Sequence, residues 1–301
     1  MTHHWGYVGA LASAVLFGIS STLNKIALEN MNPLVVAGMI YFVGGIVLFV
    51  VHSSPLHGKI LKLFETSTKT EHEITRRDFK TLALVILFGS VIAPLMLLQG
   101  LSQTTAINAS FLLSAESFFT VLLAFIFLKE RGKRKDYVGI FVLLVGVVFL
   151  TTNGRLQELT LTREVVGNLL VLGACLFWSM DNNLSRFLSK KREITLITAL
   201  KCLIGGFILL VTSLLLGISL HIPLVSLPYI LSVGGFSIAT SVLLFLFALR
   251  EIGSMRTGII YSTASLFGAV FAFAVLGEPF SIVQLLAGLV MLLGIYLLYR
   301  R

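Results

Sequence analysis

Three ionisable side chains lie within long, mostly apolar stretches of this 301-residue sequence: Glu116, Asp181 and Lys201. If these stretches cross a membrane, a charge near the middle costs about 2.5 to 3.5 kcal/mol, so each group needs a partner or a watery cavity. Glu116 has no basic residue within a helical turn. Its carboxyl group could bind an amine or carry a proton, or it could be kept neutral by burial and hydrogen bonding.

Asp181 and Lys201 are predicted to lie at similar depth. Each is ten residues from position 191, in a basic link where the chain is expected to reverse direction. A salt bridge could therefore form, either as a buried pair that fixes helix packing or as a gate or ligand for a zwitterion. Asn182 and Asn183 follow directly and place amides on adjacent helix faces, so at least one residue of the run from Asp181 to Asn183 is expected to face water or substrate.

Further polar and aromatic residues are candidates for lining a cavity: Asn24, Gln99, Asn108, Trp178, Tyr261, Ser262 and Thr263. The two large rings, Trp178 and Tyr261, are equally consistent with packing. Pro94 is the one proline deep within a predicted span, where it frees a carbonyl and predicts a hinge. The two cysteines, Cys175 and Cys202, show no metal-ligand spacing, and neither a metal nor a cofactor is expected.

The elements that position these residues are predicted from composition. Hydrophobic residues make up 56% of the chain and charged residues 12%, and the mean hydropathy is +0.96. About 20 apolar residues in a helix cross a hydrocarbon core of about 30 Å. Ten stretches qualify: Trp5–Glu29, Pro33–Val51, Lys80–Leu101, Thr104–Leu128, Asp136–Thr152, Glu164–Leu188, Ile194–Gly217, Val225–Leu249, Ser254–Leu276 and Ser281–Tyr299. The expected fold is an all-α membrane protein with ten transmembrane helices.

The basic residues predict the orientation. Of the 23 Lys and Arg residues, 19 fall in the links on one side of the ten predicted spans and three on the other. The side rich in Lys and Arg is normally cytoplasmic, so both termini are predicted to be cytoplasmic, in a multi-pass protein of the cell membrane. A nucleic-acid partner is not expected, because these residues form no patch interleaved with aromatics.

An internal repeat divides the predicted spans into two groups of five. A shift of 161 residues aligns Gly6 with Gly167, Phe17 with Trp178, Leu23 with Leu184, Lys25 with Arg186 and Gly44-Gly45 with Gly205-Gly206. A shift of 148 residues aligns Ser117 with Ser265, Glu130 with Glu278 and Gly146 with Gly294. Residues 1–154 and 155–301 are therefore predicted to be repeats, inverted because each has an odd number of spans.

Two smaller patterns concern helix ends and helix packing. Glu130 and Glu278 each precede the next predicted helix and are predicted to be caps and turn-formers rather than substrate contacts. Small residues recur every fourth position, at Gly6, Ala10, Ala14 and Gly18 in the first span and at Ala264, Gly268 and Ala272 in the ninth. Such stripes let helices approach closely.

The sequence resembles the drug/metabolite transporter superfamily, specifically its ten-helix members with two EamA-type halves, over essentially the whole chain. The residues that carry the likeness are Phe17-Gly18, Lys25 and Pro33, then Trp178 and Ser185-Arg186, and finally Leu276-Gly277-Glu278, Gly288 and Gly294. The resemblance implies secondary transport, often export, of amino acids or related metabolites. It also implies a central cavity lined mainly by spans one, three, four, six, eight and nine.

The sequence departs from the family pattern at positions that bear on the substrate. Tyr41 stands where the family often has Arg, and Ser117 and Ser265 stand where it often has Pro. These changes leave the expected fold intact and the substrate open.

The predicted function is secondary transport, most simply export, of amino acids or related small polar metabolites by alternating access through a central cavity. The alternative is a proton-coupled multidrug or organic-cation exporter in which Glu116 and Asp181 exchange protons for a cation. The expected partners are a small-molecule substrate, membrane lipid and protons as a candidate coupling ion, and the chain is expected to be a monomer or a homodimer.

An enzyme is not expected, because the sequence has no phosphate-binding loop, metal cluster or nucleophile–base motif. A channel is disfavoured because Ala264 takes the place of Glu116 in the repeat.

Overall fold

The helices of the protein are seen in a computed structural model that describes residues 3–54, 78–128, 134–152, 162–189, 194–279 and 281–299. The first half of the chain forms α1 (His3–Gly18), α2 (Ser20–Leu28), α3 (Pro33–Ser53), α5 (Phe79–Ile86), η2 (Leu87–Ile92), α6 (Ala93–Leu101), α7 (Ala106–Leu113), α8 (Ala115–Leu128) and α9 (Arg134–Thr151). The second half forms α10 (Arg163–Ser189), α11 (Ile194–Leu215), α12 (Leu227–Ser232), η3 (Val233–Thr240), α13 (Ser241–Ser262), α14 (Ala264–Leu276) and α15 (Ile282–Tyr299).

Within these ranges the fold is that of a helical membrane protein. Six helical stretches are long and apolar enough to cross a membrane, and three shorter apolar helices accompany them. Their outer surfaces carry large apolar side chains such as Phe141, Phe207 and Leu286, which in water would be an extensive hydrophobic patch. The all-helical membrane fold is thus confirmed, whereas the number of ten spans stays a prediction.

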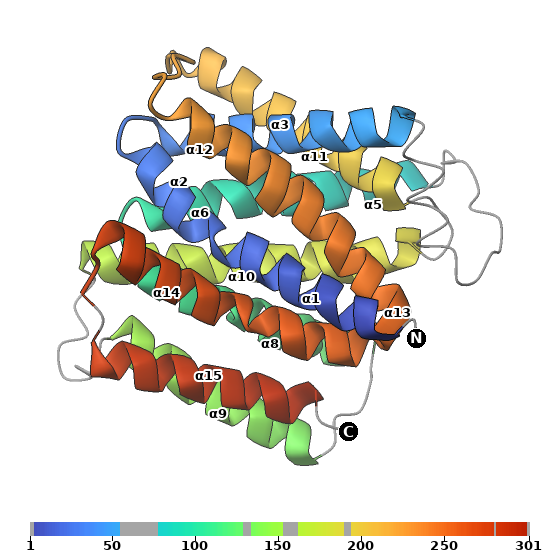
Figure 1. Cartoon of the computed structure of the whole chain (residues 1–301), viewed down its shortest axis with the longest axis vertical. Helices are drawn as coiled ribbons and strands as arrows, with labels where there is room; N and C mark the ends of the chain where they lie inside the picture. The colour runs from blue at the N-terminus through green and yellow to red at the C-terminus, as the bar shows by residue number, and fades with distance from the viewer. Residues whose placement is uncertain are drawn as a thin grey trace.

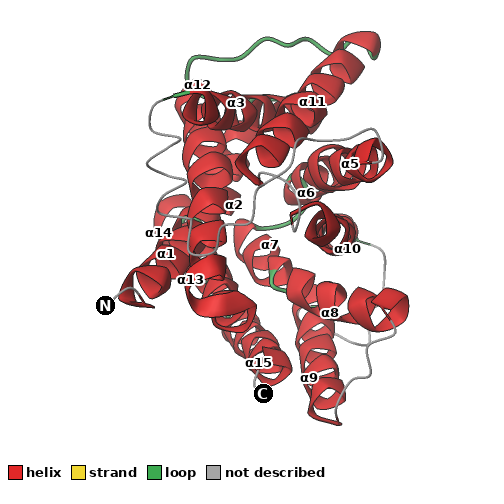
Figure 2. Cartoon of the chain, turned by 90° about the vertical axis from the view of Figure 1, so that its right-hand side faces the viewer, coloured by secondary structure: helices red, strands yellow, loops and turns green. Residues whose placement is uncertain are grey.

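The helices pack as pairs that join the two parts of the chain. α3 packs against α11, α9 against α15, α1 against α13, α10 against α6, and α14 against α7. Viewed along the bundle, the α3–α11 pair lies at one edge and the α9–α15 pair at the opposite edge (Figure 2). The two ends of the described chain lie at the same end of the bundle (Figure 1).

The chain reverses direction within α13. Phe245 and Tyr261 are 16 residues apart, which in a straight helix would separate them by about 24 Å. Their ring centroids are only 4.8 Å apart. The residues between them therefore contain the turn that the sequence predicts between its eighth and ninth stretches.

Two predicted spans contain π-helical turns, which the sequence analysis did not anticipate. η2 lies between α5 and α6 and is followed by Pro94, and η3 lies between α12 and α13. A π-helical turn leaves backbone groups out of the regular α-helical pattern and is frequent at functional sites. The fourth predicted span is also interrupted, because the Ser114 N–H donates to the Phe111 carbonyl, three residues back, where α7 ends and α8 begins.

The small-residue stripes do bring helices together. A Cβ added to Gly18 of α1 would collide with the Ala264 carbonyl and approach Gly268 of α14, and Gly268 in turn lies against the Gly18 carbonyl. This contact holds α1 and α14 at a backbone-to-backbone distance that only small residues permit.

Candidate functional site

The centre of the site is an ion pair between α10 and α11. Lys201 Nζ lies 2.6 Å from Asp181 Oδ2, and the Asp181 side chain is only 3% exposed. Ser185, one turn further along α10, donates its hydroxyl to Asp181 Oδ1 at 2.8 Å. The predicted salt bridge is therefore present, and both carboxylate oxygens have partners, as a buried charge requires.

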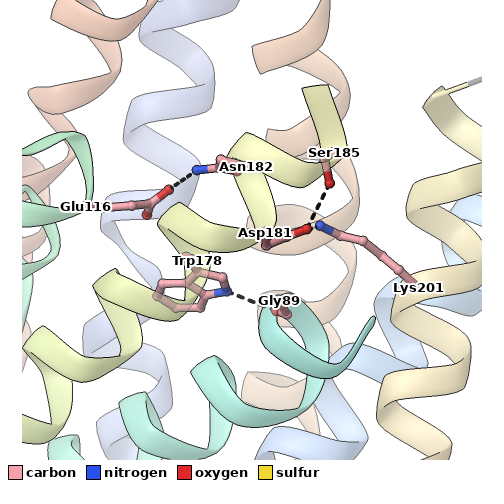
Figure 3. A network of polar contacts seen from close by, with 7 residues as sticks. All are labelled: Gly89, Glu116, Trp178, Asp181, Asn182, Ser185 and Lys201. Atoms are coloured by element: carbon pink, nitrogen blue, oxygen red, sulfur yellow. Dashed lines mark hydrogen bonds and ion pairs between the residues drawn. The ribbon is translucent and has the colours of Figure 1, made fainter. Parts of the chain in front are cut away.

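The π-helical turn of η2 supports this pair through Gly89. A Cβ at Gly89 would collide with the carboxylate of Asp181, so only glycine lets α10 come this close. Trp178, one turn before Asp181, donates its indole N–H to the Gly89 carbonyl at 3.0 Å. Trp178 and Asp181 of α10 thus both contact Gly89 of η2 (Figure 3).

A second carboxylate lies on another side of α10. Asn182 donates its amide to Glu116 Oε1 at 2.6 Å, and Glu116 is the second residue of α8, directly after the interruption of the fourth span. Asp181 and Asn182 therefore turn toward different helices, one to Lys201 and the other to Glu116 (Figure 3). We call the set Glu116, Asp181, Asn182, Ser185 and Lys201 the mid-span network.

Backbone contacts fix the position of Glu116. The hydroxyls of Ser179 and Thr120 both donate to the Glu116 carbonyl, at 2.8 and 2.9 Å. Asn183 donates its amide to the Ser179 carbonyl at 2.9 Å and to the Thr120 carbonyl at 3.3 Å. The amide of Asn183 thus holds α8 against α10, whereas the amide of Asn182 reaches the carboxylate.

A small cavity lies beside this network. It has about 20 Å³ of room for water-sized groups, enough for roughly one or two waters. Two of the candidate cavity residues, Asn24 and Trp178, line it together with Pro94, the candidate hinge. Its other walls come from Phe17, Ser20, Ala37, Ile40, Tyr41, Leu97, Leu98, Val233 and Ile238. Three of these residues belong to α3, a helix that the family resemblance did not assign to the cavity.

Four of the candidate residues lie neither at this cavity nor in the mid-span network. Gln99 is exposed on α6. Tyr261, Ser262 and Thr263 lie at the junction of α13 and α14, where the Tyr261 ring contacts Phe17 at a centroid distance of 5.5 Å. Tyr261 thus contacts the lining residue Phe17 but does not itself line the cavity.

Asn108 lies at one end of the bundle, away from the mid-span network. It is the third residue of α7, donates to Glu164 Oε1 and accepts from the Gln284 amide, both at 2.9 Å. Nearby, Thr104 donates to Asn168 Oδ1 at 2.6 Å, and Lys25 Nζ donates to the carbonyls of Leu101 and Thr104. These contacts connect α2, α7, α10 and α15.

Glu278 completes this group by capping α7. Its two carboxylate oxygens accept the backbone N–H groups of Ala106 and Ile107 at 2.8 and 2.9 Å. The predicted capping role is confirmed, but the helix is α7 rather than the following helix, α15, whose first turn is capped by Ser281 and Gln284. We call Lys25, Thr104, Asn108, Glu164, Asn168, Glu278 and Gln284 the helix-end network; Glu130 lies outside the described residues.

Sequence reasoning missed the residues whose role depends on contact between distant helices. Gly89, Ser179 and Thr120 had no signal beyond their position in apolar stretches, although Gly89 lies five residues before Pro94. In the described ranges, no group of three His, Cys, Asp or Glu side chains is placed to hold a metal ion.

Comparison with known proteins agrees with this architecture. The EamA-like transporter family matches residues 4–152 and again residues 165–300. A protein of Methanothermobacter thermautotrophicus named as an uncharacterized transporter is 42% identical over 99% of this chain and 87% of its own length. The uncharacterized transporter YyaM of Bacillus subtilis is 22% identical over 98% of this chain and 93% of its own length.

A solved crystal structure shares the fold. It superposes with a TM-score of 0.67 at 14% identity and covers 97% of this chain and 95% of its own chain. The apolar helical bundle is that of a multi-pass membrane protein, and the family match identifies the class as membrane transporters. The chain belongs to the EamA-like transporter family, whose members move small molecules across membranes.

Proposed function

We propose that the protein is a secondary transporter that exports amino acids or related small polar metabolites by alternating access. The observation that carries the proposal is the mid-span network. Asp181, Asn182 and Asn183 follow one another on α10. Asp181 contacts the ammonium of Lys201, and Asn182 contacts the carboxylate of Glu116 on another side of the helix. A zwitterion needs opposite charges at one depth of the membrane, and Asp181 and Lys201 supply them while Glu116 supplies a second acid.

The position of the network supports its access to water. Asn182 is exposed, although it lies within the stretch Arg163–Ser185, which is long and apolar enough to cross a membrane. An amide and a carboxylate facing lipid at that depth would be costly, so we place this face of α10 in a water-filled vestibule. Substrate entering the vestibule would meet Glu116 and Asn182 first and the Asp181–Lys201 pair next.

Two inverted halves, residues 1–154 and 155–301, would provide the moving parts. The family matches the chain twice, and each main helix pair takes one helix from each half. η2 and η3 occupy corresponding places in the third and eighth predicted spans, next to Pro94 in the first case. Helices with irregular turns can bend during alternating access, and we assign the hinge to η2 and Pro94.

We propose a multi-pass location in the cell membrane with both termini in the cytoplasm. The excess of Lys and Arg in the links on one side supports this orientation. The placement of both ends of the described chain at the same end of the bundle is consistent with it (Figure 1).

A proton-coupled exporter of organic cations is the second candidate. It is favoured by the contact of Glu116 with a neutral amide rather than with a basic group, which leaves its charge available to a cation or a proton. The two candidates differ in the role of Lys201, because a cation needs no ammonium in its site.

Counterflow in proteoliposomes tests the proposal. Vesicles are loaded with pooled unlabelled amino acids, and uptake of each labelled amino acid is compared with that of empty vesicles. Accumulation of at least one amino acid, lost in Glu116→Gln, supports the amino-acid carrier. Absence of accumulation for every amino acid, with tetraphenylphosphonium resistance in cells, supports the cation exporter instead.

A further inference from the structure

The cavity beside the mid-span network has a lining without charge. Its walls are mostly apolar or aromatic, and its polar groups come from Ser20, Asn24, Tyr41 and Trp178. Trp178 also lies one helical turn before Asp181 and Asn182 on α10, so the cavity adjoins the charged groups. A molecule held by those charges would therefore extend its uncharged part into this cavity.

The donors of two lining residues are already engaged. The Ser20 hydroxyl donates to the Phe17 carbonyl at 2.6 Å, and the Trp178 indole donates to the Gly89 carbonyl at 3.0 Å. Neither is available to a ligand without breaking a bond inside the protein. Of the polar lining residues, Asn24 and Tyr41 therefore remain as the side chains that a ligand in the cavity could contact.

Asn24 presents an acceptor that has no partner. Its side chain is 97% buried, at 3% relative exposure, and its Oδ1 makes no hydrogen bond. Buried polar atoms are nearly always paired, and an orphaned one at a cavity wall indicates a missing ligand or water. Asn24 is the one residue that both lines the cavity and carries such an atom in the described part of the chain.

We propose that Asn24 determines specificity by selecting substrates whose uncharged end carries a hydrogen-bond donor. This inference rests on the proposed function, because it assigns the charged end of the same substrate to the mid-span network. The substrate class is a zwitterion with a small neutral side chain that ends in a hydroxyl or an amide. The small volume of the cavity favours a small side chain over a large ring.

Isosteric amino acids test this assignment. Threonine and valine have nearly the same shape, but only threonine carries a donor. In counterflow with the wild-type protein, threonine should compete with a labelled substrate about tenfold better than valine, the factor expected from one neutral hydrogen bond. Asparagine should similarly exceed leucine, and tryptophan should compete more weakly than threonine.

A variant without the acceptor should remove the preference. Asn24→Leu keeps the approximate volume, and its threonine-to-valine ratio should fall to about one. Thr22→Val is the matched control, because Thr22 is fully buried on the same helix but does not line the cavity. Its ratio should remain that of the wild type.

Thermal stabilisation of the purified protein separates this inference from the proposed function. If no amino acid is transported, the proposed function fails, and the shift in Tm with threonine and with valine still measures binding. A larger shift with threonine, lost in Asn24→Leu, supports the inference. Equal shifts in the wild type, no shift with either, or a preference that persists in Asn24→Leu overturns it.

Discussion

The mid-span network and the helix-end network are built from the same kinds of residues and differ in what these residues contact. In the helix-end network, Glu278 and Lys25 bind backbone groups at the ends of α7 and α6. In the mid-span network, Asp181 and Lys201 pair in the interior of α10 and α11, and Glu116, in the first turn of α8, accepts from the Asn182 amide. The carboxylate of Glu278 completes a helix, and that of Glu164, which accepts from the Asn108 amide, also lies in the first turn of a helix. The Asp181 carboxylate, paired with an ammonium within two spans, can exchange that partner for a substrate.

A buried charge needs different partners at a helix end and in the middle of a span. At a helix end, unpaired N–H groups and the helix dipole stabilise an anion without another side chain. In the middle of a span every backbone group is normally paired, so a charge requires a side-chain partner or water. Removing one member of the mid-span network should therefore cost more than removing one member of the helix-end network.

The largest loss of stability is expected when the ion pair is broken. Asp181→Ala leaves the ammonium of Lys201 without its partner, and an unpaired buried charge costs about 3 to 5 kcal/mol. We expect a lower Tm in detergent and reduced yield in size-exclusion chromatography. The double variant Asp181→Ala with Lys201→Met, which removes both charges, should recover most of the stability; if it is no more stable than Asp181→Ala, the pair is not the source of the loss.

An intermediate loss is expected from a methyl group at Gly89. Gly89→Ala places a Cβ against the Asp181 carboxylate and separates α10 from η2, and overpacking of this kind costs about 1 to 3 kcal/mol. Both Tm and counterflow should fall. Gly235→Ala is the matched control in η3, because a Cβ there meets nothing within 4 Å. Equal effects at the two glycines would contradict the role of Gly89.

The smallest loss is expected at the helix-end network. Glu278→Gln keeps a side-chain oxygen near the N-terminus of α7 but removes the charge, and such a charge–dipole contact contributes about 0.3 to 1 kcal/mol. Tm should fall slightly, and counterflow per folded protein should not change. The measurement is thermal unfolding paired with counterflow at matched protein density. A large loss of transport in this variant would remove the distinction between the two networks.

The sequence was sufficient for features that depend on distance along the chain. The Asp181–Lys201 pair was predictable because both residues are equally far from the same link, and the helical membrane fold followed from apolar stretches of the right length. The end location of Asn108 could have been inferred as well, because it lies only four residues after the predicted start of its span at Thr104.

Features that depend on contact between distant helices could not be predicted from the sequence. The bond from Asn182 to Glu116 joins residues 66 positions apart, and its existence depends on how α8 packs against α10. Glu278 was recognised as a cap but assigned to the wrong helix, because α7 reaches it only in the folded bundle. The π-helical turns η2 and η3 likewise arise from packing and not from a local sequence signal.

Glu116→Gln separates a role of the mid-span network in transport from a role in stability, because the variant removes a charge and keeps an oxygen that can accept the Asn182 amide. Counterflow and Tm are measured together on the wild type, Glu116→Gln and Glu278→Gln. Glu116→Gln is expected to lose at least about tenfold in counterflow, equivalent to about 1.4 kcal/mol, with little change in Tm. Wild-type counterflow in Glu116→Gln would contradict the assignment of transport to the mid-span network.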